Sequence, residues 1–193
     1  MSKTVVADTP VMKQFLDIKS KYDDTIILFR MGDFYETFLD DAVVTSQVLG
    51  IVLTKRANGK AADVNLAGFP YHSLDNYLPK LVKAGYRVAI CEQIEDPKTT
   101  KGIVKRDVVE VVTPGTLTAD KTLTDKSNRY IGSMFFKNNS IGIAFLDSST
   151  GEFHIGQCEK ENINNFLLKF SPQEVVLPKK VVYSDSLWYR EYK

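Results

Sequence analysis

Long hydrophobic runs are missing from this sequence of 193 residues, and none approaches the roughly 20 residues that a membrane helix needs. Residues 1–9 lack the apolar segment and small-residue cleavage site of a secretory signal. We therefore expect a cytoplasmic protein with no membrane partner. Cysteine is scarce, and Cys91 and Cys158 stand far apart without a CxxC partner. This spacing favours two reduced, buried thiols over a disulfide or a zinc site.

Sequence motifs of enzymes are missing as well. There is no GxxxxGK[ST] phosphate-binding loop, no HExxH metal motif and no serine nucleophile elbow. The two histidines, His72 and His154, fall in different parts of the chain and do not predict a shared metal site. A nuclease with paired cations needs clustered carboxylates, whereas Asp147 stands beside a Ser-Ser-Thr-Gly stretch that is typical of a turn. We predict that the chain is not an enzyme and binds no cofactor or metal.

An excess of charge of one sign is also missing. The formal net charge is +1, and residues 1–115 hold equal numbers of basic and acidic side chains. Nonspecific affinity for nucleic acid comes mainly from neutralised phosphates. The composition therefore gives no support to broad DNA binding, and any contact with DNA must come from a particular site.

The first 115 residues alternate helix and strand signals. Thr9-Pro10 precedes an apolar-periodic helix at Val11–Lys21, and Ser73 is placed to cap another helix that ends before Gly85. Asp40-Asp41 opens a helix between them, closed by Gly50 and carrying an apolar stripe of Leu39, Ala42, Val43, Ser46 and Leu49. Strands are predicted at 25–30, 34–38, 51–54, 86–94 and 107–113, and a loop with an Asn-Gly turn at 55–63. This order predicts an α/β domain with a mixed sheet.

The pattern changes after residue 115. Residues 116–127 are polar and rich in threonine, which favours a linker. Three strands at 130–136, 140–146 and 151–157, a helix at 160–170 and a strand at 174–177 are expected next. This order matches the opening of a ribonuclease-H-like fold. Because the last residues cannot supply the rest of such a sheet, we expect residues 128–193 to form a partial domain.

Residues 30–38, with the sequence RMGDFYETF, allow two interpretations. Phe34 and Phe38 alternate with polar neighbours, and periodicity alone favours two core side chains. A Gly-Asp break directly before Phe34 could instead present that ring, exposed, at the start of a strand. The core interpretation leaves Glu36 unexplained, because on a strand it shares a face with Phe34.

This segment resembles the mismatch-recognition motif of the MutS family, an aromatic residue and a glutamate separated by one residue. Two further segments resemble the same family in the same order: LAGFPYHSLDNYLPKLVKAGYRVAICEQIEDP at 66–97 and VVTPGT at 111–116. The likeness implies a mismatch-recognition domain at 1–115, a linker at 116–127 and the start of the family's connector domain at 128–193. The family's lever, clamp and ATPase regions are not expected in this chain.

The resemblance assigns the central roles to Phe34 and Glu36. The family's phenylalanine enters the minor groove and stacks on a base of the mispair, and the family's glutamate contacts the mispaired base. Residues with a supporting role are Met31, Asp33, Lys55, Arg56, His72 and Lys105. Other basic residues that could contact phosphates are Lys60, Lys98, Lys101 and Arg106. Solvated charge remains an equal interpretation of these basic loops, and His72 is equally placed to cap the following helix.

Partners and rivals follow from the same likeness. The implied function is recognition of mispairs and small insertion or deletion loops in duplex DNA, in a bacterial, nucleoid-associated protein. The family also implies a MutL-type partner, a second MutS subunit, and ATP with magnesium bound elsewhere in the full-length protein. One rival is a protein-interaction module that contacts the MutL-type partner. The other is a binder of branched DNA that is indifferent to mispairs, against which the pairing of Phe34 with Glu36 argues.

Overall fold

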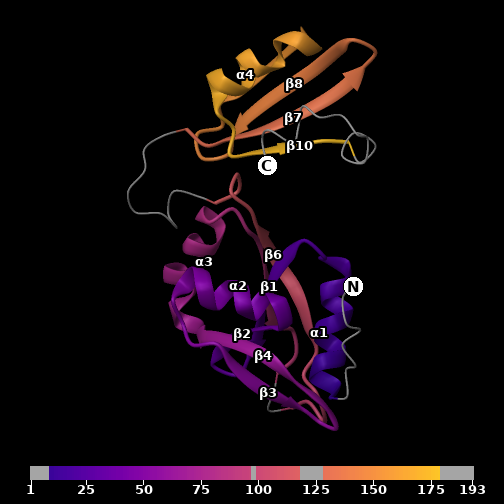
Figure 1. Ribbon diagram of the computed structural model, residues 1–193, viewed down its shortest axis with the longest axis vertical. Coiled ribbons are helices and arrows are strands. Elements are labelled where there is room, and N and C mark those ends of the chain that lie inside the picture. The colour runs from indigo at the N-terminus through magenta and orange to yellow at the C-terminus, as the bar shows by residue number, and fades with distance from the viewer. Residues whose placement is uncertain (1–8, 97–98, 118–127, 179–193) are drawn as a thin grey trace. The chain divides into compact units, whose positions relative to one another are not determined.

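The structure is a computed structural model that describes residues 9–96, 99–117 and 128–178. It divides into two compact units, Met1–Leu117 and Thr118–Lys193 (Figure 1). Each unit combines helices with a mixed sheet, which confirms the predicted fold class. Most of the expected linker, 118–127, lies outside the described residues, and the domain limits drawn from the sequence stay predictions.

A six-stranded sheet forms the centre of the first unit, in the order β3-β4-β2-β1-β5-β6. The strands are β1 (Thr25–Met31), β2 (Phe34–Phe38), β3 (Thr54–Asn58), β4 (Ala61–Pro70), β5 (Arg87–Gln93) and β6 (Arg106–Val112). The central pair β1 and β5 is parallel, and every other neighbouring pair is antiparallel. Strand β3 is an edge strand, and its register with β4 shifts between Arg56 and Asn58.

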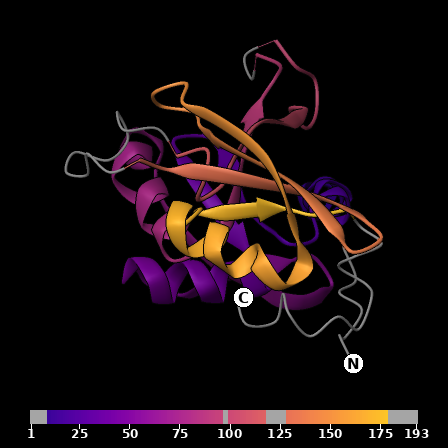
Figure 2. The same ribbon diagram turned by 90° about the horizontal axis from the view of Figure 1, so that it is seen from above.

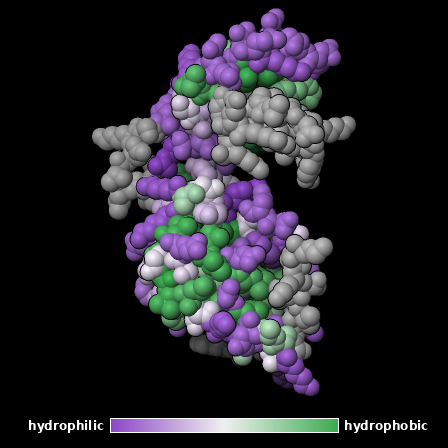
Figure 3. Space-filling model, viewed as in Figure 1, coloured by the Kyte–Doolittle hydropathy of each residue, from purple (hydrophilic) through white to green (hydrophobic). Residues whose placement is uncertain are grey.

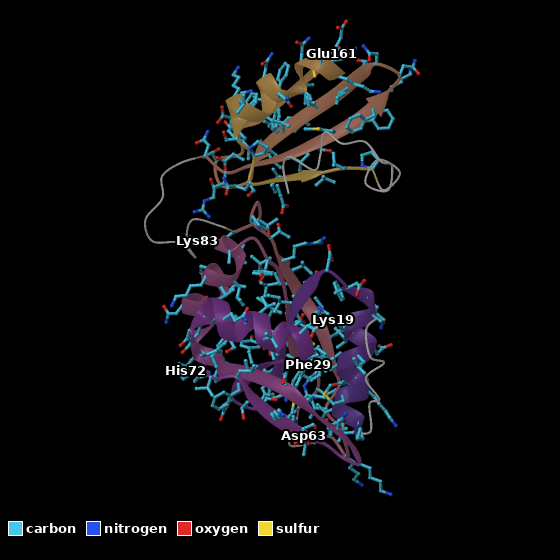
Figure 4. The ribbon with its side chains drawn as sticks, viewed as in Figure 1. Lys19, Phe29, Asp63, His72, Lys83 and Glu161 are labelled. Carbon is cyan, nitrogen blue, oxygen red and sulfur yellow. The ribbon has the colours of Figure 1, made fainter. Side chains whose placement is uncertain are left out.

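Helices lie on both faces of this sheet (Figure 1). Helix α1 (Pro10–Lys21) begins as predicted, with Thr9 Oγ1 accepting from the Met12 N–H at 3.4 Å and proline at the first helical position. Its Met12, Phe15 and Ile18 side chains bury one face of the sheet together with Phe29 and Phe38. Helices α2 (Leu39–Leu49) and α3 (Leu74–Lys83) bury the other face. Figure 4 marks Lys19 on α1 and Phe29 in the sheet.

The predicted strand at 51–54 and the loop at 55–63 are wrong. Residues 51–53 form no strand, whereas β3 and β4 form a hairpin whose turn residues are Gly59 and Lys60, with Gly59 at φ 65°. Gly59 adopts a positive φ at the first central position of the turn, which favours glycine. Polar residues dominate β3, which is an exposed edge, and so the hydrophobic alternation that signals a strand is weak there.

Two details of the predicted helices also need correction. The buried residues of α2 are Asp41, Ala42, Thr45 and Leu49, so the predicted Leu39, Val43 and Ser46 are only partly buried. Asp41 is buried because Lys19 Nζ lies 2.8 Å from its Oδ1 and the Ile27 N–H donates to its Oδ2 at 3.1 Å. Ser73 precedes α3, but no side-chain capping bond from it occurs among the described residues.

The second unit follows the predicted strand-strand-strand-helix-strand order. Its elements are β7 (Tyr130–Lys137), β8 (Ser140–Asp147), β9 (Phe153–Glu159), α4 (Ile163–Phe170) and β10 (Glu174–Val176), and the sheet order is β10-β7-β8-β9. Asn138 forms the β7–β8 turn at φ 56°. Helix α4 covers one sheet face (Figure 2) and buries Ile163 and Leu167 against it. The side chains of Phe135, Phe153 and Ile155 are exposed.

Asp147, at the end of β8, accepts hydrogen bonds from the backbone around it. It is fully buried, and its carboxylate accepts hydrogen bonds from the backbone of Ser149, Thr150 and Arg129 and from the Ser149 hydroxyl. These bonds hold its pKa below the ordinary value although burial opposes them. The arrangement confirms the predicted turn. In the described ranges, no helix is long and apolar enough to cross a membrane.

Candidate nucleic-acid interface

Phe34 is exposed at the first position of β2. The β1–β2 turn is formed by Gly32 and Asp33, with Gly32 in the left-handed region at φ 57°, which a residue with a Cβ rarely adopts. The turn places Phe34 opposite Met31 of β1 and Pro70 of β4, at the end of the sheet. Its side chain is 46% exposed, whereas Phe38 on the same strand is 0% exposed. The core interpretation is therefore wrong for Phe34 and right for Phe38.

Arg30 and Tyr71 brace this turn. The Tyr71 N–H donates to the Asp33 carbonyl at 2.9 Å, which joins the turn to the end of β4. Arg30 Nε donates to the Gly32 carbonyl at 2.6 Å, and the Arg30 guanidinium stacks over the Tyr71 ring with its carbon 3.8 Å from the ring centroid. A cation over an aromatic ring is an attractive contact. The backbone that carries Phe34 is thus held from two sides.

Tyr35 anchors the same strand to the opposite face of the sheet. Its ring is buried beside Phe69, and its hydroxyl donates a hydrogen bond to the Glu92 carboxylate of β5. Arg30 Nη1 lies 3.8 Å from the same carboxylate. Burial, followed by the bond to Glu92, raises the pKa of Tyr35. The Tyr35 hydroxyl therefore remains a hydrogen-bond donor. Because side chains alternate along β2, Phe34 and Glu36 point to the opposite face of the sheet from Tyr35.

Glu36 lies between Phe29 of β1 and Gly68 of β4 in the strand register. A Cβ at Gly68 would lie 2.8 Å from the Tyr35 carbonyl oxygen and 3.4 Å from Glu36 Cγ, so glycine is the residue that leaves room for the glutamate side chain. The glutamate side chain is 19% exposed. Its Oε2 accepts from Arg56 Nη1 at 2.6 Å, which is a short charge-assisted hydrogen bond.

Arg56 reaches Glu36 from a distance along the sheet. Its backbone pairs with Val64, beyond the Leu66 position that faces Phe38, so the side chain extends back over the Phe38 ring, 5.8 Å from its centroid. The arginine side chain remains 33% exposed. The Arg56 side chain is therefore partly accessible to solvent while it holds the carboxylate.

Burial raises the pKa of Glu36 above its ordinary value, and the nearby Arg56 and Arg106 only partly oppose this. The environment of the folded protein, without DNA, therefore already disfavours the charged form of this carboxyl. A carboxylate accepts hydrogen bonds when ionised and donates one when protonated. The raised pKa favours the protonated, donating form of Glu36 relative to that of an ordinary glutamate.

The structure brings together some of the predicted site residues. Met31, Asp33, Phe34 and Glu36 share the β1–β2 hairpin, and Arg56 joins them through its side chain. His72 follows in the short 3-10 helix η1 (Tyr71–Ser73), exposed, with its ring 5.9 Å from Tyr71 (Figure 4). Because Pro70 pairs with Phe34, His72 lies near the same end of the sheet.

Two lysines predicted to support the site do not join Phe34 and Glu36 on the same face of the hairpin. Lys105 is exposed directly before β6, and its backbone N–H donates to Glu95 at 2.9 Å. Lys55 pairs with Asn65 and precedes Arg56 on β3, so alternation turns it to the opposite face from Glu36. Lys98 lies outside the described residues.

Arg106 is not a surface cation, and its predicted contact with phosphate is wrong. It is 7% exposed, and its Nε donates to the Arg30 carbonyl at 2.5 Å. Its Nη1 donates to Gln14 Oε1 at 3.1 Å and to the Val104 carbonyl at 2.8 Å, and the guanidinium lies over the Phe29 ring. Arg106 therefore joins α1, β1 and β6 beneath the hairpin that carries Phe34.

Sequence reasoning missed Arg30, Tyr71 and Gly68. Arg30 and Tyr71 border recognisable turns, but their contact joins residues that are far apart in the chain. Gly68 could be recognised only from the pairing of β4 with β2, and β4 itself was not predicted. Among the described residues, no group of three or more histidine, cysteine, aspartate or glutamate side chains could hold a metal ion.

Comparisons with known proteins agree along the length of the chain. The family model described as MutS domain I matches residues 9–121, and the model described as MutS domain II matches residues 129–191. A protein of Flavobacterium psychrophilum named DNA mismatch repair protein MutS is 54% identical over 180 residues, which is 93% of this chain and 21% of that protein.

Two further relatives bear the same name. The protein of Flavobacterium johnsoniae is 56% identical over 175 residues, which is 91% of this chain and 20% of the relative. The protein of Porphyromonas gingivalis is 52% identical over 177 residues, which is 92% of this chain and 20% of the relative. The chain thus spans about a fifth of the length of the curated relatives that it matches.

Proposed function

This chain belongs to the MutS family of DNA mismatch repair proteins, and we propose that its first unit recognises mispaired and looped bases in duplex DNA. The exposure of Phe34 is the observation that carries this proposal. A large aromatic ring is half-exposed on a strand whose other large apolar residues are buried, and a braced turn holds its backbone in place.

Phe34 is proposed to act as a wedge. Inserting an aromatic side chain into a base step costs a few kcal/mol of unstacking. Stacking one base on the ring returns about 1–3 kcal/mol. A mispaired or looped base has already lost part of its pairing and stacking, so the same insertion costs less there. The difference favours a mispair without reading the surrounding sequence.

Glu36 is proposed to supply selectivity at the same position. A carboxylate is repelled by phosphates, so it lowers the affinity for every duplex unless a base compensates. When ionised it can accept from a thymine imino N–H, and when protonated it can donate to a purine N7. The raised pKa of Glu36 supports the second possibility.

The direct test is a pair of binding titrations at one fixed, low salt concentration, with a G·T duplex and its matched control. The chain should prefer the G·T duplex. Phe34→Ala should weaken G·T binding by about 1–3 kcal/mol and leave weak matched binding nearly unchanged. Phe135→Ala, which removes an exposed ring from the second unit, is the matched control and should change neither titration. Equal binding of both duplexes by the parent chain would refute the proposal.

The remaining features are proposals about the longer protein. We propose that ATP, magnesium and a second MutS subunit act with regions other than the described residues, and that this chain has no ATPase activity. A second candidate function, contact with a MutL-type protein, is favoured by the exposed side chains of Phe135, Phe153 and Ile155 in the second unit. Figure 3 shows hydrophobic residues, in green, at the surface of this unit. Such binding would survive Phe34→Ala and be lost on Ile155→Asp, which separates the two functions.

A further inference from the structure

Arg56 binds the Glu36 carboxylate and so competes for it with a DNA base. Within the described part of the chain, the Glu36 carboxylate accepts a charged hydrogen bond from the Arg56 guanidinium at 2.6 Å. The strand positions on either side of Glu36 are Phe29 and Gly68, which offer no side-chain donor. The other cation that acts on Glu36, Arg106 of β6, directs its hydrogen bonds to Arg30, Gln14 and Val104.

The pair is asymmetric in a way that suits an exchange of partners. Glu36 is the more buried member, at 19% exposure, and Arg56 is the more exposed, at 33%. The long Arg56 side chain extends from an edge strand and lies over Phe38, so its guanidinium can turn toward solvent without moving the backbone of the hairpin. Guanidinium groups bind phosphate as well as carboxylate, because their donors match both geometries.

We propose that Arg56 is a specificity-determining residue, which holds Glu36 before DNA binds and moves to a backbone phosphate only where a base can accept or supply a hydrogen bond to Glu36. This inference rests on the proposed function. At a mispair the glutamate gains a base and the arginine gains a phosphate, so both charges are compensated. At a matched duplex no base replaces Arg56, and the exchange would leave a half-buried carboxylate near phosphates without its cation.

The same exchange explains why a cation and an anion occupy one recognition surface. If Arg56 only contacted phosphate, its loss would weaken all duplexes equally. If Arg56 only neutralised Glu36, its loss would change the protonation of Glu36 and leave phosphate contacts intact. The exchange predicts that the effect of Arg56 on discrimination depends on the presence of Glu36.

A double-mutant cycle tests this dependence. The four chains are the parent, Arg56→Met, Glu36→Gln and the double variant, and each is titrated with G·T and matched duplexes at one salt concentration. Methionine keeps an apolar stem over Phe38 and removes the charge. In the parent background, Arg56→Met should lower the ratio of G·T to matched affinity by about threefold or more. In the Glu36→Gln background Arg56 is released on both duplexes, so the same substitution should weaken both equally.

Three controls separate the possible failures. Lys55→Met removes a cation from the same strand that does not face Glu36, and it should weaken both duplexes by the same factor. Thermal melting establishes that each variant is folded. Carbon NMR of the Glu36 carboxyl without DNA should give a higher pKa in Arg56→Met than in the parent, because one opposing cation is removed.

Two results would overturn the inference. One is an equal loss of G·T and matched affinity on Arg56→Met in the parent background, which would make Arg56 a simple phosphate contact. The other is the same fall in ratio in both backgrounds, which would make its effect independent of Glu36. A parent chain that does not distinguish G·T from matched DNA would instead refute the proposed function, since no ratio would then exist for Arg56 to change.

Discussion

Phe34 and Phe38 lie on the same face of the same five-residue strand, and yet they have opposite environments. Phe38 is packed edge-on against Phe15 of α1 and Phe29 of β1, with ring centroids 5.0 and 6.0 Å away. Phe34, four residues earlier, faces Met31 and Pro70 at the end of the sheet and is half-exposed. Helix α1 covers one end of the strand, and a single face therefore serves stability at one end and binding at the other.

The largest effect that distinguishes these ends is on stability. Phe38→Ala should lower the free energy of unfolding by about 3–5 kcal/mol, because it removes a fully buried ring from a cluster that α1 seals. Phe34→Ala is the matched control and should change stability by less than about 1 kcal/mol. Urea unfolding of both variants measures the difference. Similar losses for both would mean that the two ends of β2 are equally part of the core.

The next largest expected effect is on stability and comes from Gly68, which lies opposite Glu36 on β4. Gly68→Ala should lower stability by about 1–3 kcal/mol, because the new Cβ would meet the Tyr35 carbonyl at 2.8 Å and press on Glu36. Gly142→Ala, where a Cβ would meet only the Phe135 carbonyl at 3.9 Å, is the control and should be much milder. A harmless Gly68→Ala would show that Glu36 does not need the space opposite it.

Glu36→Gln should act on binding more than on stability. The amide keeps the shape of the side chain, removes its repulsion by phosphates and supplies both a donor and an acceptor. Matched duplex should therefore bind more tightly, by roughly 1 kcal/mol, and the ratio of mismatched to matched affinity should narrow. Titrations at fixed salt measure this. Equal weakening of both duplexes would identify Glu36 as a structural residue, like Phe38.

The smallest effect is the pH dependence of stability due to Glu36. Its folded pKa is raised, so the folded chain binds this proton more tightly than the unfolded chain. The contribution of Glu36 to stability is therefore most favourable at acid pH and declines as the pH rises from the ordinary glutamate pKa through the raised value. Unfolding of the parent should show this decline relative to Glu36→Gln. A difference that grows with rising pH would mean that Arg56 outweighs burial.

The sequence predicted the helices and central strands well because their signals are local. Thr9-Pro10 begins α1, and the apolar segments of β1 and β5 form the buried parallel pair. It failed for β3, whose polar residues reflect an exposed edge, and for β4, which pairs with that edge and was partly taken for a loop. It found Phe34 and Glu36 as a motif, but periodicity alone favoured a buried Phe34. The ion pair of Glu36 with Arg56 and the stack of Arg30 on Tyr71 depend on contacts across strands, which no local pattern specifies.

The edge position of β3 has a consequence for self-association. An exposed edge strand offers unpaired backbone groups to which another chain can add a strand, and such addition leads to aggregation. Here β3 is only five residues long, carries the adjacent charges Lys55 and Arg56, and loses its regular register between Arg56 and Asn58. Short length, charge and a bulge are features that oppose strand addition. The same edge strand that supplies Arg56 to Glu36 therefore also resists pairing with other copies of the chain. This resistance to aggregation leaves the sheet face with Phe34 and Glu36 open for binding.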